Sequence, residues 1–140
     1  MSIPLEGYAF LDALAVGESG GDYTILYGGG HFSDFSKFPV WGGLDDSHAA
    51  GRYQFEPATW AGEAAKLHLK DFSPANQDIA AWDLAVHVYA HCARRNLEDD
   101  LCAGVLGHVA GALHSTWTSL NYLFLSRYDT ALARRKAVLA

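Results

Sequence analysis

The stretch from Asp22 to Tyr53 constrains the fold most, because it interrupts a chain whose pattern is otherwise helical. It contains the segments YGGGHFSDFS and FPVWGG, in which glycine and aromatic residues dominate and helical periodicity is absent. Clustered glycines are typical of turns, and aromatic residues favour strands. The stretch is therefore predicted to form β-hairpins and loops.

Helical patterns flank this stretch on both sides. Pro57 suits the first position of a helix, where no amide proton is needed. Ser73 followed by Pro74 is a second start signal, with the serine as N-cap. The predicted helices cover residues 5–17, 57–67, a segment that starts at 74, 101–113 and 123–138. The helix that starts at 74 is expected to bury a stripe formed by Ile79, Trp82, Val86, Tyr89 and Ala93.

The order of a helix, a small β-rich lobe and several further helices predicts an α+β fold with the β part inserted after the first helix. All 140 residues fit one domain, since domains most often hold about 100–150 residues. Such a layout leaves a cleft between the two lobes, and clefts are where substrates bind.

The charge of the chain excludes two classes of partner. The formal net charge is −6 and the isoelectric point is near 5.5. Nucleic acids and anionic membranes need clustered lysine and arginine, so neither is an expected partner. No apolar run is long enough to span a membrane, and the N-terminal segment lacks the basic and apolar regions of a signal peptide.

Glu18 is the candidate catalytic residue. At roughly 100° per residue it falls about 20° from Leu11 around the first helix, so it continues the apolar face. Partial burial favours the neutral carboxyl group, and the negative end of the helix dipole does the same, so both raise its pKa. A proton donor for glycosidic bond cleavage needs a raised pKa. The hydroxyl of Ser19 is placed to orient this carboxyl group.

Four segments occur in order over residues 10–78: FLDALAVGESGG, HFSDFSKFP, AAGRYQFEPATW and LHLKDFSPANQD. Trp117-Thr118-Ser119-Leu120 follows farther on. This ordered set resembles the endolysins of the lambda-phage type, which are lytic transglycosylases with a lysozyme-like fold. The resemblance implies one lysozyme-like catalytic domain over residues 1–140, bacterial peptidoglycan glycan strands as partner, a monomer, and no cofactor or metal.

The resemblance also implies roles for individual residues. Glu18 takes the place of the family's catalytic acid and base, and Gly51-Arg52-Tyr53-Gln54 looks like its Gly-x-x-Gln element. Gln54 would then bond either Glu18 or the acetamido group of the sugar, although it could equally pack the lobe. Arg52 and Tyr53 are expected to hold the β-lobe to the helices. The predicted substrate-binding residues are Ser19, Gln54, Tyr53, Tyr23, Asp34 and Trp41.

Two reactions and one non-catalytic function remain open. A transglycosylase needs only Glu18, which protonates the glycosidic oxygen and then accepts the proton of the muramyl 6-hydroxyl. A hydrolysing muramidase needs a second carboxylate, for which Asp22, Asp34, Asp45 and Asp46 are candidates. Asp34 is the best of these, but it is expected to hold its own loop by side-chain-to-backbone hydrogen bonds. A glycan-binding protein that keeps the fold is the third possibility.

The remaining residues of chemical interest carry weaker expectations. His87 and His91 lie four residues apart beside Cys92, but the pattern does not match a metal-binding motif. Cys92 and Cys102 are expected as two core residues or, alternatively, as a disulfide. Tyr122 and Tyr128 are both candidates for a tyrosine in the cleft. The resemblance further implies synthesis in the host cytoplasm without a signal peptide and action on the periplasmic cell wall.

Overall fold

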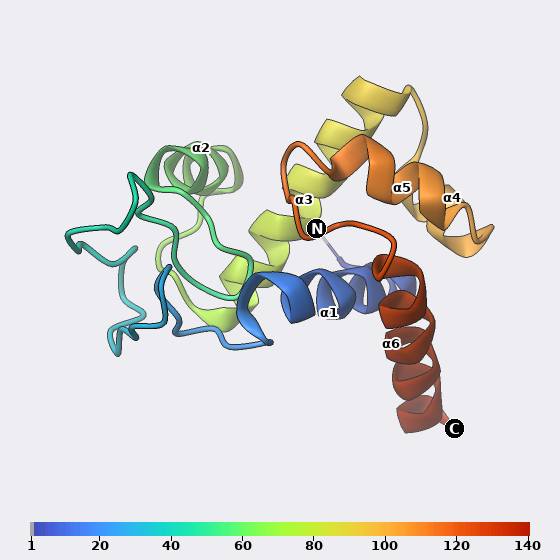
Figure 1. The fold of residues 1–140 in the computed structure, drawn as a ribbon, viewed down its shortest axis with the longest axis horizontal. Coiled ribbons are helices and arrows are strands. Elements are labelled where there is room, and N and C mark those ends of the chain that lie inside the picture. Colours follow the sequence, from blue (N-terminus) through green and yellow to red (C-terminus); the bar gives the residue numbers. More distant parts are fainter. Residues whose placement is uncertain (1) are drawn as a thin grey trace.

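The computed structural model describes residues 2–140, and its ordered elements are helices joined by loops (Figure 1). In chain order they are α1 (Leu5–Ser19), α2 (Pro57–Leu67), α3 (Pro74–Ala93), α4 (Leu97–Cys102), α5 (Leu106–Leu113) and α6 (Phe124–Leu139). The expectation of a mostly helical protein is confirmed.

Helix α1 forms the centre of the helical body, by which we mean α1 and α3–α6. It packs against α6 along much of its length and also contacts α3 and α4. Phe10 on α1 is fully buried and meets the rings of Trp82, Trp117 and Phe124 edge to face, with ring centroids 5.8–6.5 Å apart. These aromatic contacts join the middle and the end of the chain to its first helix.

The predicted helix starts are confirmed. Pro57 is the first residue of α2, and the Ser73 side chain accepts a hydrogen bond from the Asn76 amide at the start of α3. Of the predicted stripe on α3, Trp82 and Tyr89 are buried, whereas its other members are half-buried. The buried surface of α3 is broader than one stripe because α1, α2, α4 and α5 all pack against it.

The prediction of one continuous helix over 101–113 is wrong. The chain forms α4 and α5 instead, separated at Gly104, whose φ of 75° is left-handed and ends the first helix. The apolar pattern continues through this break because Leu101 and Leu106 are both buried on the same core. The hydrophobic pattern therefore hides the interruption.

Residues 20–56, here called the loop lobe, form the long excursion between α1 and α2 (Figure 1). The predicted loops are confirmed for this lobe, but the predicted β-hairpins are not: the described residues 2–140 contain no strand, and only isolated bridges such as Leu26–Ala50 and Ala50–Phe55 link its turns. Turns with positive φ at Gly28, Gly29 and Gly43 shape the chain between these bridges.

A small aromatic cluster fills the space between the loop lobe and α2. The ring of Phe72 is fully buried and lies 4.6 Å from Trp60 and 4.9 Å from Phe38, centroid to centroid. Phe32 packs on the same ring at 5.7 Å. Trp60 and Phe72 are buried in this cluster, and Phe32 and Phe38 are half-buried against it, so these four rings form the core of this part of the molecule.

Polar side chains attach the loop lobe to the helical body. The Tyr53 hydroxyl donates to Asp78 on α3 at 2.6 Å, and the Arg52 guanidinium donates to Asp12 on α1 at 3.1 Å and to the Tyr53 oxygen at 2.8 Å. The indole of Trp117 donates to the Tyr53 carbonyl at 3.1 Å. The structural role predicted for Arg52 and Tyr53 is confirmed.

Two further expectations are settled by the fold. Cys92 and Cys102 are both exposed and unbridged, so neither the core placement nor the disulfide is correct. Cys92 lies in the last turn of α3, and Cys102 is the last residue of α4. None of the helices formed by residues 2–140 is long and apolar enough to cross a membrane.

Candidate active site

Glu18 lies in the last turn of α1, where the helical body meets the loop lobe. Its side chain is half-buried, and its Oε1 accepts a hydrogen bond of 2.7 Å from the Ser119 hydroxyl. Burial raises the pKa of Glu18 above its ordinary value, although hydrogen bonds from Ser119 oppose the rise. The predicted direction of this shift is confirmed.

Ser119 is the contact that sequence reasoning missed. It follows α1 by a hundred residues and belongs to the segment Trp117–Leu120 that precedes α6. Trp117 anchors this segment to the loop lobe through the Tyr53 carbonyl. The signal was present as the resemblance of Trp117-Thr118-Ser119-Leu120 to the family, but no residue pattern connects that segment to α1.

Gly17 allows this approach. A Cβ atom at Gly17 would lie 2.6 Å from the Ser119 Cβ and 3.1 Å from a guanidinium nitrogen of Arg127. Any side chain there would push the segment Trp117–Leu120 away from α1. The glycine before Glu18 therefore keeps the Ser119 hydroxyl within reach of the carboxyl group.

The predicted orientation of Glu18 by Ser19 is wrong. The Ser19 hydroxyl lies 2.7 Å from the Arg52 carbonyl and 3.3 Å from the Ala15 carbonyl, and it accepts from the Gly21 amide. Its bonds thus join the end of α1 to the loop lobe. Ser119 takes the position near Glu18 that the sequence assigned to Ser19.

Gln54 is engaged within the loop lobe. Its side-chain amide donates to the Gly51 carbonyl at 2.9 Å and lies 3.4 Å from the Ile25 carbonyl, and its own φ is +53°. These contacts correspond to the packing role weighed against the catalytic one. No hydrogen bond joins Gln54 to Glu18 among the described residues.

Tyr23 and Tyr53 share one acceptor on α3. Both hydroxyls bond Asp78, and the Arg52 guanidinium stacks over the two rings at 5.0 and 5.5 Å. Burial raises the pKa of Tyr23 to about 12 and raises the pKa of Tyr53 further, so both phenols stay neutral. Tyr53 is fully buried, which leaves Tyr23 as the half-buried member of the pair.

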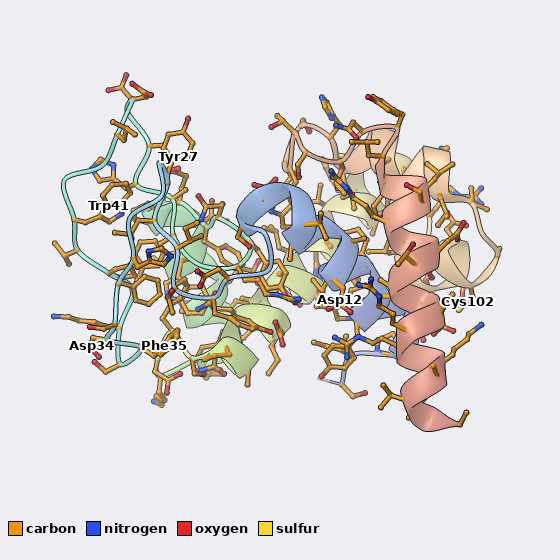
Figure 2. All side chains as sticks on the ribbon, turned by 60° about the horizontal axis from the view of Figure 1, so that its bottom comes forward. Asp12, Tyr27, Asp34, Phe35, Trp41 and Cys102 are labelled. Atoms are coloured by element: carbon orange, nitrogen blue, oxygen red, sulfur yellow. The ribbon has the colours of Figure 1, made fainter. Side chains whose placement is uncertain are left out.

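Asp34 and Trp41 lie on the loop lobe, at the end of the molecule away from α6 (Figure 2). Asp34 is exposed and accepts a 2.8 Å bond from the Ser36 amide, which confirms its predicted role in holding the loop. The indole of Trp41 donates to the His48 carbonyl at 3.2 Å and its ring is half-buried. The exposed part of the Trp41 ring lies on the surface of the loop lobe.

The other acidic candidates also have local partners. Asp22 accepts two bonds of 2.7 Å from Thr24 and one of 3.0 Å from His31, and the bonds from Thr24 hold its pKa below the ordinary value. Asp45 and Asp46 occupy a tight exposed turn at positive φ. Of the two tyrosine candidates, Tyr128 is buried while Tyr122 is 83% exposed, so Tyr122 alone is accessible.

The fold is that of a phage lysozyme. Bacteriophage lambda lysozyme complexed with a chitohexasaccharide matches with a TM-score of 0.78 at 25% identity, covering 94% of this chain and 96% of that one. A second structure, lysozyme from bacteriophage lambda, matches with a TM-score of 0.76 at 27% identity over 98% and 96% of the two chains.

The sequence comparisons identify the family. The endolysin family model matches residues 8–132, and the chain belongs to the endolysin family. The endolysin of Escherichia phage lambda is 36% identical over 52% of this chain and 54% of that protein. The endolysin of Escherichia phage P2 is 29% identical over 80% and 77%. The matched part thus spans about half of the lambda protein and three quarters of the P2 protein.

Proposed function

We propose that this chain cleaves the glycan strands of bacterial peptidoglycan as a lytic transglycosylase, with Glu18 as general acid and then general base. The observation that supports this most is the half-buried carboxyl group of Glu18. Burial raises its pKa, and the hydrogen bond from Ser119 holds it in one orientation. Membership of the endolysin family and the chitohexasaccharide in the lambda lysozyme structure point to a glycan substrate.

The reaction requires two proton transfers through Glu18, first from its carboxyl group and then to it. Protonated Glu18 donates to the oxygen between N-acetylmuramic acid and N-acetylglucosamine, and the bond from C1 to that oxygen breaks. The acetamido oxygen of the sugar stabilises the positive charge at C1. The Glu18 carboxylate then accepts the proton of the muramyl 6-hydroxyl as that oxygen bonds C1. The products are a free 4-hydroxyl end and a 1,6-anhydro sugar, and no water is consumed.

A raised pKa suits both halves of this cycle. An acid with an ordinary pKa would be ionised at neutral pH and could not donate, whereas one that stays protonated too strongly would not leave the carboxylate needed in the second half. The Ser119 hydrogen bond stabilises the carboxylate, so it opposes the effect of burial and limits the rise of the pKa.

Peptidoglycan lies outside the cytoplasmic membrane, so the proposal includes synthesis in the host cytoplasm and action in the periplasm.

The alternative is a muramidase that adds water to the same bond. Asp22 favours the muramidase. It follows Glu18 by four residues, and the hydrogen bonds from Thr24 lower the pKa of its carboxyl group and so keep it ionised. A hydrolase uses such a second carboxylate as nucleophile or as base for water. Mass spectrometry of digested peptidoglycan separates the two reactions, since anhydro ends are lighter than hydrolysed ends by one water, about 18 Da.

The decisive variant is Glu18→Gln, assayed by the clearing of permeabilised Gram-negative cells. The amide cannot donate a proton as the acid does, so we expect the rate to fall by about 10²–10⁴-fold. Glu98→Gln, an exposed glutamate in the first turn of α4, removes the same charge elsewhere and should clear cells like the parent. A Glu18→Gln protein that clears cells at the parent rate would overturn the assignment.

A further inference from the structure

A cavity of about 380 Å³ opens between α1, α6 and the loop lobe. Figure 2 shows Asp12, one of its lining residues, between α1 and α6. The polar side chains that line it are Asp12, Arg52, Ser126, Arg127, Thr130 and Arg134. Three guanidinium groups around one small cavity are unusual in a chain whose formal net charge is −6.

The one carboxylate of the cavity is already neutralised. Asp12 accepts bonds of 2.7 and 2.8 Å from Arg135 and one of 3.1 Å from Arg52. Burial acts to raise the pKa of Asp12, but these guanidinium groups outweigh it and hold the pKa below the ordinary value, so Asp12 stays ionised. Arg127 and Arg134 form no ion pair with any residue in 2–140, which leaves two cationic groups facing the cavity.

The cavity is separate from the site at Glu18. Asp12 and Val16 line it from one side of α1, since they are four residues apart, and Gly20, the left-handed cap of α1, lines it next to them. Glu18 is two residues from Val16, about 160° away around the helix. Glu18 is not among the lining residues, but Arg127 also approaches Gly17, so a group bound in the cavity would lie near the catalytic carboxyl group without contacting it.

We propose that this cavity binds the carboxylate groups of the short peptides that branch from peptidoglycan strands. Guanidinium groups recognise carboxylates through paired hydrogen bonds, and the hydroxyls of Ser126 and Thr130 offer two more donors. The assignment of the ligand rests on the proposed function, and it gives an acidic protein a local means of holding an acidic polymer.

The test is a calorimetric titration with stem tetrapeptide released from purified cell walls. The Glu18→Gln protein is used, so that traces of glycan in the peptide are not cleaved during the measurement. Removing both free cations in Arg127→Gln/Arg134→Gln should weaken binding about five- to tenfold, as expected for two partly exposed ion pairs. Thr130→Glu, which adds a negative charge to the cavity wall, should weaken it as well. Lys70→Gln/Arg94→Gln removes two exposed positive charges elsewhere and should leave binding unchanged.

Equal peptide binding by the parent and by Arg127→Gln/Arg134→Gln would overturn the proposal, as would an equal loss in Lys70→Gln/Arg94→Gln. A parallel titration with inorganic phosphate separates the ligands, because binding as tight as that of the peptide would make this a general anion site and refute the peptide assignment. The titration does not depend on catalysis. Should Glu18→Gln retain full lytic activity, the proposed reaction fails while the peptide result still decides the cavity.

Discussion

The helical body and the loop lobe are stabilised by different kinds of interaction. In the helical body, buried apolar side chains of α1 and α3–α6 pack on one another around Phe10. In the loop lobe, isolated bridges and glycine turns shape the backbone, and a few polar atoms of Arg52, Tyr53 and Gln77 attach it to the helices. Apolar packing in the helical body is spread over many contacts, whereas the lobe is attached by the aromatic cluster around Phe72 together with a few hydrogen bonds.

The candidate active site depends on both regions, because it lies where they meet. Glu18 ends the rigid helix α1, and Ser119 reaches it from a segment that also bonds the loop lobe through Trp117. The catalytic carboxyl group is thus carried by the helical body, while the groups around it depend on how the lobe is attached. We expect core substitutions to affect the whole molecule and lobe substitutions to affect the lobe and the site.

The largest effect is expected from Phe10→Ala. Removing this fully buried ring leaves a cavity among three aromatic partners and should cost about 3–5 kcal/mol of unfolding free energy, measured by urea denaturation. Val16→Ala on the same helix, 52% exposed, should change it by less than about 0.5 kcal/mol. A loss confined to the loop lobe in Phe10→Ala would contradict the view that this ring holds the helical body.

Tyr53→Phe tests the other side of the comparison. Deleting the buried hydroxyl removes one donor to Asp78 and one acceptor of Arg52, and should cost about 1–3 kcal/mol. Hydrogen exchange should quicken at the amides of residues 23–55 and stay slow in α1 and α3. Tyr27→Phe, a tyrosine 42% exposed, is the matched control. Equal acceleration in helices and lobe would mean that the two regions unfold as one unit.

A buried polar contact between α2 and α3 departs from the apolar packing that prevails among the helices. Glu63 on α2 is buried beside Asp83, and one of its carboxyl oxygens has no hydrogen-bond partner. Burial, together with the Asp83 carboxylate, raises the pKa of Glu63 to about 7. Lys66 lies 2.8 Å from Asp83 and His87 3.3 Å from it, on the exposed side of the pair.

The sign of the pH effect follows from the raised pKa. Between the ordinary pKa of 4.5 and about 7 the folded protein holds a proton that the unfolded chain has lost, so stability should fall as pH rises through this window and then level off. The fall should be on the order of 1–2 kcal/mol. Glu63→Gln cannot titrate and should remove this fall in thermal unfolding measured from pH 5 to pH 8. An unchanged slope in that variant would assign the pH dependence to other groups.

The smallest effect is expected from Ser119→Ala. The hydroxyl stabilises the Glu18 carboxylate, so its loss should raise the pKa of Glu18 and move the alkaline limb of the lytic activity to higher pH by less than about one unit. Ser115→Ala, an exposed serine nearby in sequence, should leave the profile in place. A shift to lower pH would show that Ser119 does not stabilise the carboxylate.

Local sequence signals determined much of this protein. Ser73, Pro74 and Pro57 start their helices as predicted, because capping and proline geometry involve only neighbouring residues. The position of Glu18 on the apolar face of α1 was likewise sufficient to predict partial burial and a raised pKa. Ordered motifs over residues 10–78 were sufficient to indicate the family, which the comparisons then confirmed.

The tertiary structure alone decided which groups meet. Periodicity shows which face of a helix is buried but not which residue covers it, so Ser119 was missed and its position was assigned to Ser19. The same limit applies to Cys92 and Cys102, whose surroundings depend on how helices pack. In the loop lobe, strand formation depends on pairing between separate segments, and that pairing stays limited to isolated bridges despite a composition that favours hairpins.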